Sequence, residues 1–246
     1  MQRSAFKKKI YVALLEKPLV RKATRLHFIG RSEIDSATDV FGNVDYCLVP
    51  NGQELSTRSA RFGQHKLVFA FVGRLDMRTK GLDLLLEGLA KFAAQTTQPL
   101  ELRVVGDGPD REKLEGLAAR FAITHLITFY GACFGQQKQE ALDGVDFLCL
   151  TSRNEGMPGV VLEAAATGIP VLVSHETNLA EYVSRYFCGV GLAENTAAAI
   201  AEGLQAASRA KEMGMQEVWG QNARTMIQRE FNWATIGQQL LEAYAA

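Results

Sequence analysis

The sequence lacks several features that would place it in a common class of protein. Its apolar runs are only a few residues long, so none reaches the roughly 20 residues that a transmembrane helix needs. The first residues also lack the apolar core of a secretory signal peptide, which makes the cytoplasm the default expectation. The formal net charge is zero, and this argues against nonspecific binding of nucleic acid.

Cysteine and histidine are not arranged as a metal site. The cysteines Cys47, Cys133, Cys149 and Cys188 show no C-x-x-C spacing, and three of them lie in apolar or strand-like segments. We expect all of them to be reduced thiols with structural roles. The histidines form no metal-ligand pattern either, so the sequence predicts neither a metal nor a bound cofactor.

Positive charge is concentrated at the start of the chain, in Arg3, Lys7, Lys8, Lys9, Lys17, Arg21, Lys22, Arg25 and Arg31. Two interpretations remain open. The segment is either a solvated helix face or a patch that contacts anionic lipid headgroups, which would bring the protein to the inner face of a membrane.

Short apolar runs alternate with helical patterns along most of the chain. Strands are expected at 67–72, 100–105, 126–130, 145–150, 171–174 and 189–192, with earlier ones at 26–29 and 46–49. Helices are expected near 82–94, 111–121, 136–142, 160–166, 178–183, 197–213, 215–229 and 233–244. This alternation predicts an α/β fold with a doubly wound, parallel, Rossmann-like sheet followed by carboxy-terminal helices.

The stretch from 145 to 170 says most about function. Glu155 falls in the loop between an expected strand and an expected helix, and Glu163 falls two turns after Glu155, in that helix. In an open α/β sheet, ligands bind at the carboxyl ends of the strands, and the N–H groups at a helix start attract anions. Two carboxylates with backbone amides between them suit a sugar that is joined to a nucleotide by a diphosphate.

The spacing of Glu155 and Glu163 resembles the E-x7-E signature of glycosyltransferase family 4, also called glycosyltransferase group 1, whose members are retaining enzymes of GT-B fold. Two further blocks support the resemblance. Residues 71–90, FVGRLDMRTKGLDLLLEGLA, look like the family's G-R…K-G block, with one extra residue between Arg74 and Lys80. Residues 103–109, RVVGDGP, look like its second strand and G-x-G-P turn.

The resemblance implies a set of ligand-binding residues. Arg74 and Lys80 would hold the donor diphosphate, Glu155 would contact the hydroxyl groups of the transferred sugar, and Glu163 would accept hydrogen bonds from the ribose. Gly73 would belong to the backbone loop that approaches the ligand.

The residues between the two glutamates would contribute mainly backbone. The amides of Met157, Gly159 and Val160 are expected to face sugar or phosphate, whereas Pro158 has no N–H to offer. Gly156 and Gly159 would allow close approach of the backbone to the ligand.

The resemblance also implies a mechanism without a protein nucleophile. The acceptor would attack from the face that the leaving phosphate vacates, and that phosphate would help to deprotonate it. Positioning and charge stabilisation would supply most of the catalysis. No metal is implied, because Arg74 and Lys80 would do what a divalent ion does in other transferases.

A complete GT-B enzyme has two Rossmann-like domains, and the chain looks like the second with the tail of the first. Residues 1–60 would be a remnant of the acceptor domain plus linker, 61–230 the donor domain, and 231–246 a helix that packs back towards the first domain. The expected reaction transfers a sugar from a UDP- or GDP-sugar to a glycan or lipid-linked acceptor, as in polysaccharide biosynthesis. The chain by itself is expected to be inactive.

Two other classes stay open. The chain could be a nucleotide-sugar-binding fragment without transfer activity, or a subunit of a split enzyme that needs an amino-terminal-domain partner chain or a second copy. It could also be an epimerase or hydrolase that shares the fold. An epimerase would need acid and base groups from both domains at the sugar, and the pairing of two cations with two glutamates fits a transferase better.

Overall fold

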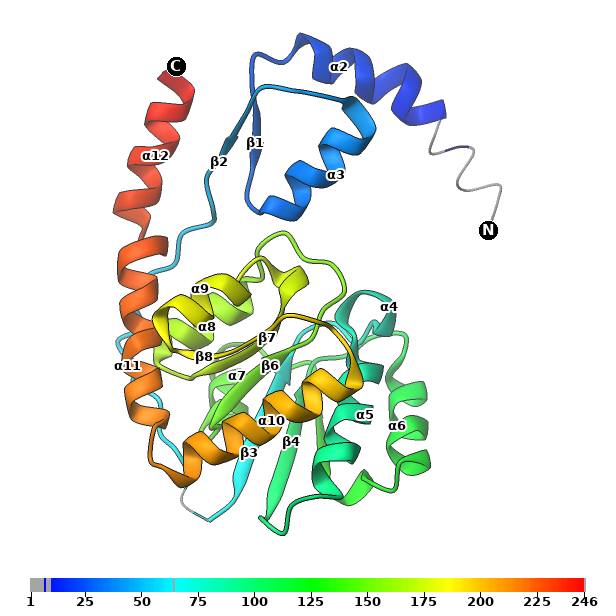
Figure 1. Ribbon diagram of the computed structural model, residues 1–246, viewed down its shortest axis with the longest axis vertical. Helices are drawn as coiled ribbons and strands as arrows, with labels where there is room; N and C mark the ends of the chain where they lie inside the picture. Colours follow the sequence, from blue (N-terminus) through cyan, green and yellow to red (C-terminus); the bar gives the residue numbers. More distant parts are fainter. Residues whose placement is uncertain (1–6, 8–9, 64, 246) are drawn as a thin grey trace.

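The computed structural model describes residues 7, 10–63 and 65–245, and it contains two parallel sheets (Figure 1). The main sheet has six strands in the order β5-β4-β3-β6-β7-β8. These strands are β3 (Leu67–Val72), β4 (Leu100–Val105), β5 (Ile127–Gly131), β6 (Phe147–Leu150), β7 (Val171–Ser174) and β8 (Gly189–Leu192). The predicted α/β fold with a doubly wound parallel sheet is therefore confirmed.

The strands form where the sequence has short apolar runs bounded by turn residues. Every residue of β3, β6 and β7 is buried, as expected of parallel strands that are covered on both faces. The chain order of the strands reverses between β3 and β6, and such a switch point opens a crevice at the carboxyl ends of the two strands. The topology thus makes the loops that follow β3 and β6 the expected place for a ligand.

Helices connect the strands and cover the sheet. They are α4 (Met77–Lys80), α5 (Leu82–Ala93), α6 (Arg111–Arg120), α7 (Gly135–Leu142), α8 (Gly159–Thr167), α9 (Ala180–Tyr186), α10 (Ala197–Glu212), α11 (Gln216–Met226) and α12 (Trp233–Ala245). Short 3-10 segments precede β5 (Thr124–Leu126) and follow β7 (His175–Thr177), and a π-helical turn (Ile227–Phe231) ends α11. On one side of the sheet α10 packs on α5, and on the other α11 packs on α8 (Figure 1).

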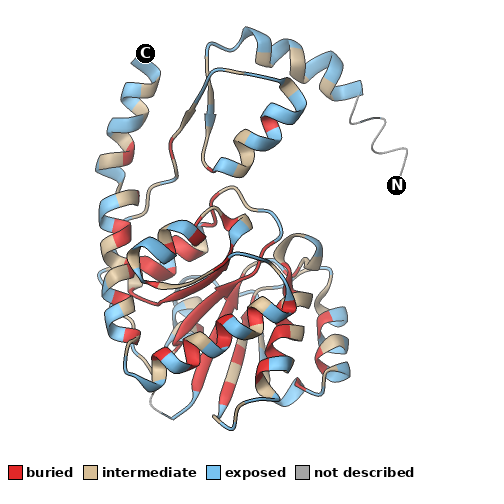
Figure 2. Cartoon of the chain, viewed as in Figure 1, coloured by how far each residue is buried: buried red, intermediate tan, exposed pale blue. Residues whose placement is uncertain are grey.

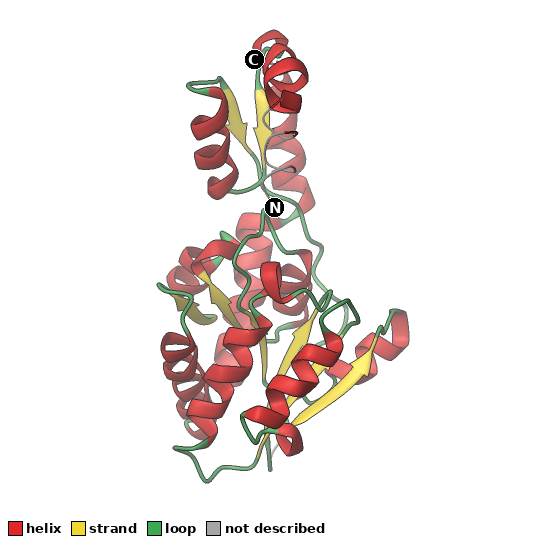
Figure 3. Cartoon of the chain, turned by 90° about the vertical axis from the view of Figure 1, so that its right-hand side faces the viewer, coloured by secondary structure: helices red, strands yellow, loops and turns green. Residues whose placement is uncertain are grey.

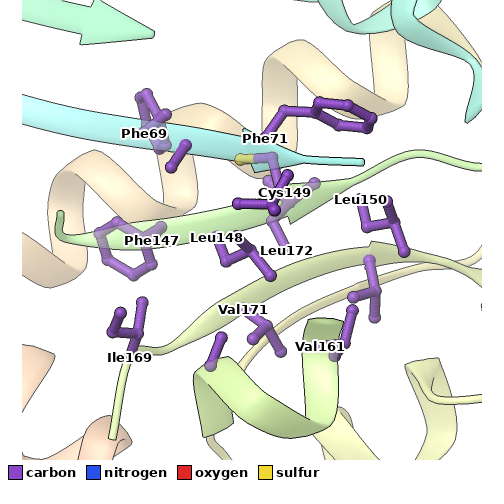
Figure 4. Close-up of a cluster of buried hydrophobic side chains, with 14 of the residues drawn as sticks. Phe69, Phe71, Phe147, Leu148, Cys149, Leu150, Val161, Ile169, Val171 and Leu172 are labelled. Atoms are coloured by element: carbon purple, nitrogen blue, oxygen red, sulfur yellow. The ribbon is translucent and has the colours of Figure 1, made fainter. Parts of the chain in front are cut away.

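The core lies between the sheet and these helices. Figure 4 shows Phe69, Phe147 and Leu172 among the side chains of three neighbouring strands, and Phe69 and Phe147 lie with ring centroids 6.0 Å apart. Figure 2 shows that most of the buried residues lie in this region. Cys149 and Cys188 are buried here, and burial raises the pKa of both thiols. All four cysteines are free thiols, as expected.

A buried ion pair closes the amino-terminal end of the sheet, opposite the crevice. Lys211 of α10 donates to Asp146, 2.5 Å away, and to the carbonyl groups of Gly63 and Lys66. Asp146 also accepts from the N–H of Val68, and burial raises its pKa in spite of these contacts. The pair ties α10 and the start of β6 to the segment that enters β3.

The first part of the chain forms a smaller α/β unit. It contains a π-helical turn (Val12–Glu16), α2 (Lys17–Lys22), β1 (Leu26–Phe28), α3 (Arg31–Phe41) and β2 (Tyr46–Leu48), and β1 and β2 pair in parallel. The unit stands beyond the carboxyl edge of the main sheet, and α12 rises beside it (Figures 1 and 3). Arg25 donates to the carbonyl group of Ala243, 3.3 Å away, so this unit is in contact with α12.

The basic segment lies mostly on this unit, although Arg3, Lys8 and Lys9 are outside the described residues. Its helical part also exposes large apolar side chains: Ile10, Tyr11, Leu14, Leu15 and Leu19. No helix within the described ranges is both long and apolar enough to cross a membrane.

Candidate functional site

The loops after β3 and β4, at the carboxyl edge of the main sheet, are hydrogen-bonded and closely packed against each other. The N–H of Gly73 donates to Val105 and that of Leu75 to Asp107. A Cβ atom on Gly106 would lie 1.8 Å from the carbonyl oxygen of Gly73, and one on Gly108 would lie 2.6 Å from that of Leu75. Only glycine permits this approach, so the predicted G-x-G-P turn braces the loop that carries Gly73 and Arg74.

Helix α4 presents Lys80 to the crevice. Asp76 caps the helix by accepting from the N–H groups of Arg78 and Thr79. Asp110 accepts from the N–H of Met77, and hydrogen bonds from Lys113 and from this N–H lower the pKa of its carboxyl group. The helix is therefore held at its amino end by two carboxylates.

The carboxyl end of α4 is fixed by a glycine. Gly81 has a left-handed backbone with φ of 62°, and a Cβ atom there would lie 2.0 Å from the carbonyl oxygen of Thr151. The hydroxyl of Thr151 donates to Gly81, and the N–H of Arg153 donates to Thr79. These contacts dock α4 onto the loop after β6. The sequence predicts a helix near 82–94, whereas Lys80 lies before it, at the end of the separate short helix α4.

Lys80 and Glu155 form an ion pair in this crevice. Their side chains are 22% and 16% exposed, so a ligand can reach both. Glu155 Oε1 also accepts from the hydroxyl of Ser152 at 2.8 Å. The structure therefore brings together a predicted diphosphate ligand and the predicted sugar ligand.

Arg74 follows β3 at the same edge and is exposed to solvent. Within the described residues it takes part in no ion pair, unlike Lys80 and Arg153, the latter of which forms a two-bonded pair with Asp83. The Asp83 carboxylate raises the pKa of Arg153 and occupies its guanidinium. Of these three cations, Arg74 is the one without a carboxylate partner among the described residues.

The segment between the two glutamates forms the start of α8. Met157 has a buried side chain in the core, and this anchors the loop from below. Gly159 and Val160 occupy the first turn, where N–H groups have no preceding helical carbonyl to bind. A Cβ atom on Gly159 would meet no other atom within 4 Å, so its surroundings are open. That these N–H groups face a ligand stays a prediction.

Glu163 lies further along α8 and forms an ion pair with Lys138 of α7. Its side chain is 51% exposed. Both residues line a groove of about 810 Å³ between α7, α8 and the linker segment at 56–61. The sequence analysis did not single out Lys138. Its position in the first helix after β5 is the only signal that could have drawn attention to it.

No motif in the sequence points to Asn178, Ser32 or Asn195 as residues that position the site. Asn195, after β8, donates to the carbonyl groups of Thr151 and Ser152 and so steadies the loop that leads to Glu155. Over the described part of the chain, no group of three His, Cys, Asp or Glu side chains could hold a metal ion.

These features match a known family of proteins. Residues 53–226 match the family described as glycosyl transferases group 1. The chain belongs to this family. The match includes both glutamates, both cations and the glycine turn, so the site lies inside the family's own region.

Individual relatives agree with the family. An uncharacterised glycosyltransferase of Methanocaldococcus jannaschii is 26% identical over 187 residues, which are 76% of this chain and 47% of that protein. The phosphatidyl-myo-inositol mannosyltransferase of Mycobacterium tuberculosis is 30% identical over 208 residues, which are 80% of this chain and 53% of that protein. The chain therefore spans about half the length of these relatives.

Among solved structures, the Anabaena protein HepE, in complex with UDP and glucose, superimposes with a TM-score of 0.79 at 18% identity. The superposition covers 96% of this chain and 67% of that one. At this identity the likeness shows a shared fold.

Proposed function

We propose that this chain is the donor-binding half of a retaining glycosyltransferase of family 4, and that it binds a nucleoside-diphosphate sugar at the carboxyl edge of the main sheet. The observation that carries the proposal is the Lys80–Glu155 ion pair at the switch point of the sheet. One cation for a phosphate and one carboxylate for sugar hydroxyls are in contact there, and both are accessible to a ligand.

The charges around the crevice suit a diphosphate. Arg74 and Lys80 offer two cations, and the first turn of α8 adds N–H groups and the positive end of a helix dipole. Two charges about 4 Å apart attract by about 4 kcal/mol at an effective dielectric of 20. As the glycosidic bond breaks, the leaving diphosphate gains negative charge, and the same groups stabilise it further.

In this proposal Glu163 accepts hydrogen bonds from the ribose, and Glu155 accepts them from the sugar. The acceptor attacks from the face that the phosphate vacates, and the phosphate takes its proton, so the protein positions both substrates and supplies no nucleophile. Residues 61–230 form the donor domain. Residues 1–60 and 231–246 belong with an acceptor domain, for a glycan or a lipid-linked acceptor.

A lipid-linked acceptor is supported by two observations. One relative is named for a mannosyl transfer to phosphatidyl-myo-inositol. The exposed side chains of Leu14 and Leu19 lie in the same segment as Lys17, Arg21 and Lys22, and an amphipathic basic helix of this kind can lie on an anionic membrane surface.

A second candidate is a nucleotide-sugar-binding subunit that transfers only with a partner chain. It is supported by the length of the chain, which matches about half of each relative described above. Both candidates share the same donor site and therefore the same first experiment.

That experiment is calorimetric titration of the chain with UDP and with GDP. Lys80→Ala removes a charge-assisted contact worth about 1.5–3 kcal/mol, so affinity for the preferred nucleotide should fall roughly ten- to hundredfold. The same substitution leaves the Glu155 carboxylate unpaired next to the phosphates. The loss of affinity should therefore lie towards the upper end of this range.

Lys91→Ala is the matched control, because Lys91 is an exposed residue of α5 that, among the residues the structure describes, forms an ion pair with Glu87 alone. It should bind like the wild type. Equal affinity of wild type and Lys80→Ala for both nucleotides would remove the assignment of Lys80, and failure of the wild type to bind either would contradict the proposed function itself.

A further inference from the structure

The side chain of Asn178 links the amino-terminal unit to the loop after β6, which carries Glu155. Its Nδ2 donates, at 2.8 Å each, to the hydroxyl of Ser32 and to the carbonyl groups of Glu155 and Gly156. Because an amide nitrogen carries two hydrogens, one of them is shared. Its Oδ1 accepts from the N–H of Ser32 at 3.0 Å. We refer to Ser32, Asn178 and the two carbonyl groups as the clasp.

The clasp completes the start of helix α3. Ser32 lies in the first turn of α3, where backbone N–H groups lack a helical acceptor. Asn178, which follows β7 and the 3-10 segment after it, supplies that acceptor. The hydroxyl of Ser32 donates to the carbonyl group of Glu155 at 3.3 Å. Asn178 has a left-handed backbone with φ of 60°, which asparagine tolerates better than most residues.

The two segments approach too closely for a side chain between them. A Cβ atom on Gly30 would lie 2.5 Å from the carbonyl oxygen of Gly156 and 2.6 Å from Nδ2 of Asn178. A Cβ atom on Gly156 would lie 2.9 Å from Glu33 and 3.1 Å from Ile29. The backbone of Gly30 therefore packs against Gly156 and the Asn178 side chain, and the side chains of Glu33 and Ile29 pack against Gly156.

The clasp holds the backbone of Glu155 and leaves Glu163 untouched. The carbonyl group of Glu155 takes hydrogen bonds from both Asn178 and Ser32, while its side chain points to Lys80 and Ser152. Glu163 lies two turns away on α8 and pairs with Lys138. Loosening the clasp therefore shifts the proposed sugar ligand and leaves the proposed ribose ligand in place.

We propose that Asn178 is a positioning residue, which uses the docked amino-terminal unit to set the orientation of Glu155 for the donor sugar. The inference rests on the proposed function, because it assumes that Glu155 meets the sugar. It adds that sugar recognition depends on whether Gly30 and Ser32 are docked on the loop after β6, whereas nucleotide recognition does not.

The test compares bare nucleotides with nucleotide-sugars. UDP, UDP-glucose, GDP and GDP-mannose serve as probes, titrated into the full chain. Asn178→Gly keeps the left-handed backbone without strain and removes only the side chain. It should weaken binding of the preferred nucleotide-sugar about three- to tenfold, the net worth of one or two hydrogen bonds, and change binding of the bare nucleotide less than about twofold.

Two further variants change residues on the amino-terminal side of the clasp. Gly30 has an extended backbone with φ of −143°, so Gly30→Ala adds a clash at the contact without strain of its own. Ser32→Ala removes the hydroxyl. Both should reproduce the selective loss. Asn222→Ala is the matched control, since it deletes a half-buried asparagine side chain that donates to the carbonyl group of Phe187, away from the clasp.

Hydrogen–deuterium exchange provides a readout that needs no ligand. The amide of Ser32, which donates to Asn178, and the segment 154–157 should exchange faster in Asn178→Gly and in Gly30→Ala than in the wild type. Segment 160–166, which carries Glu163, should be unchanged, and circular dichroism should show intact secondary structure.

The outcomes separate the two proposals. If the wild type binds none of the four probes, the proposed function fails, and the exchange of 154–157 still decides whether the clasp holds this loop. If the wild type binds and the three variants lose bare nucleotide and nucleotide-sugar equally, or lose neither, the positioning role of Asn178 is overturned. Unchanged exchange at 154–157 would overturn it as well.

Discussion

At the residue scale, the two glutamates have different surroundings, and this gives them different expected roles. Glu155 is mostly buried and bonded to a lysine and a serine hydroxyl. Glu163 is half exposed and bonded to one lysine at the wall of an open groove. A ligand that spans both must meet Glu155 with one end and Glu163 with the other.

Neutral variants of the two glutamates should therefore behave differently. Glu155→Gln removes a charge-assisted acceptor worth about 1.5–3 kcal/mol, so binding of the nucleotide-sugar should weaken roughly ten- to hundredfold. Binding of the bare nucleotide should not weaken, because the variant also removes a negative charge beside Lys80. Glu163→Gln should weaken both ligands alike. Competition titrations that find one common loss for both ligands in both variants would refute this division.

The sequence identified the residues that act through a local motif and missed those that act through distant contacts. Lys80, Glu155 and Glu163 stand in patterns that span a few residues each. Lys138 and Asn178 have no such pattern, because their partners are decided by which loops meet at the sheet edge. Asn178 pairs with Ser32, 146 positions away in the chain. No single sequence signals a pair of that kind.

At the scale of elements, the sequence predicted the strands well and missed the single-turn helix α4. Four expected strands have the observed bounds, among them Leu67–Val72 and Val171–Ser174, because continuous apolar runs with turn residues at both ends have few alternative structures. Helix α4 was not predicted. It has a single turn, and its stability comes from Asp76, Asp110 and Gly81, which are contacts at its ends.

Gly81 should be indispensable to the position of α4. In Gly81→Ala the left-handed backbone costs about 1–2 kcal/mol, and the clash with the carbonyl group of Thr151 adds to this. The free energy of unfolding in urea should fall accordingly. Nucleotide affinity should fall too, because Lys80 is the residue immediately before Gly81.

Gly116→Ala is the opposite case and serves as the control. Gly116 lies inside α6, and a Cβ atom there would meet nothing within 4 Å. The substitution should raise stability by about 0.4–1 kcal/mol through the unfolded state and leave nucleotide affinity unchanged. A Gly81→Ala protein as stable as the wild type would show that α4 can move away from the β6 loop.

At the scale of the whole molecule, the main sheet and the amino-terminal unit differ in how far their apolar side chains are covered. The main sheet is enclosed by helices and forms a core of its own (Figure 2). The amino-terminal unit has two strands and exposes a row of large apolar side chains, with Leu14 70% and Leu19 67% exposed. Such a surface is usually covered by another protein surface or by lipid.

We therefore expect the chain alone to bind a nucleotide-sugar and to transfer no sugar, because it spans about half the length of these relatives and, in our proposal, that half is the donor-binding one. An amino-terminal half, added as a separate protein, should restore transfer to a glycan or lipid-linked acceptor, measured with radiolabelled donor. Lys80→Ala should abolish the restored turnover, whereas Lys91→Ala should not. Turnover by the unsupplemented chain as a monomer in light scattering would contradict the expectation. Turnover that appears only with the added half would favour a split enzyme over a fragment that merely binds.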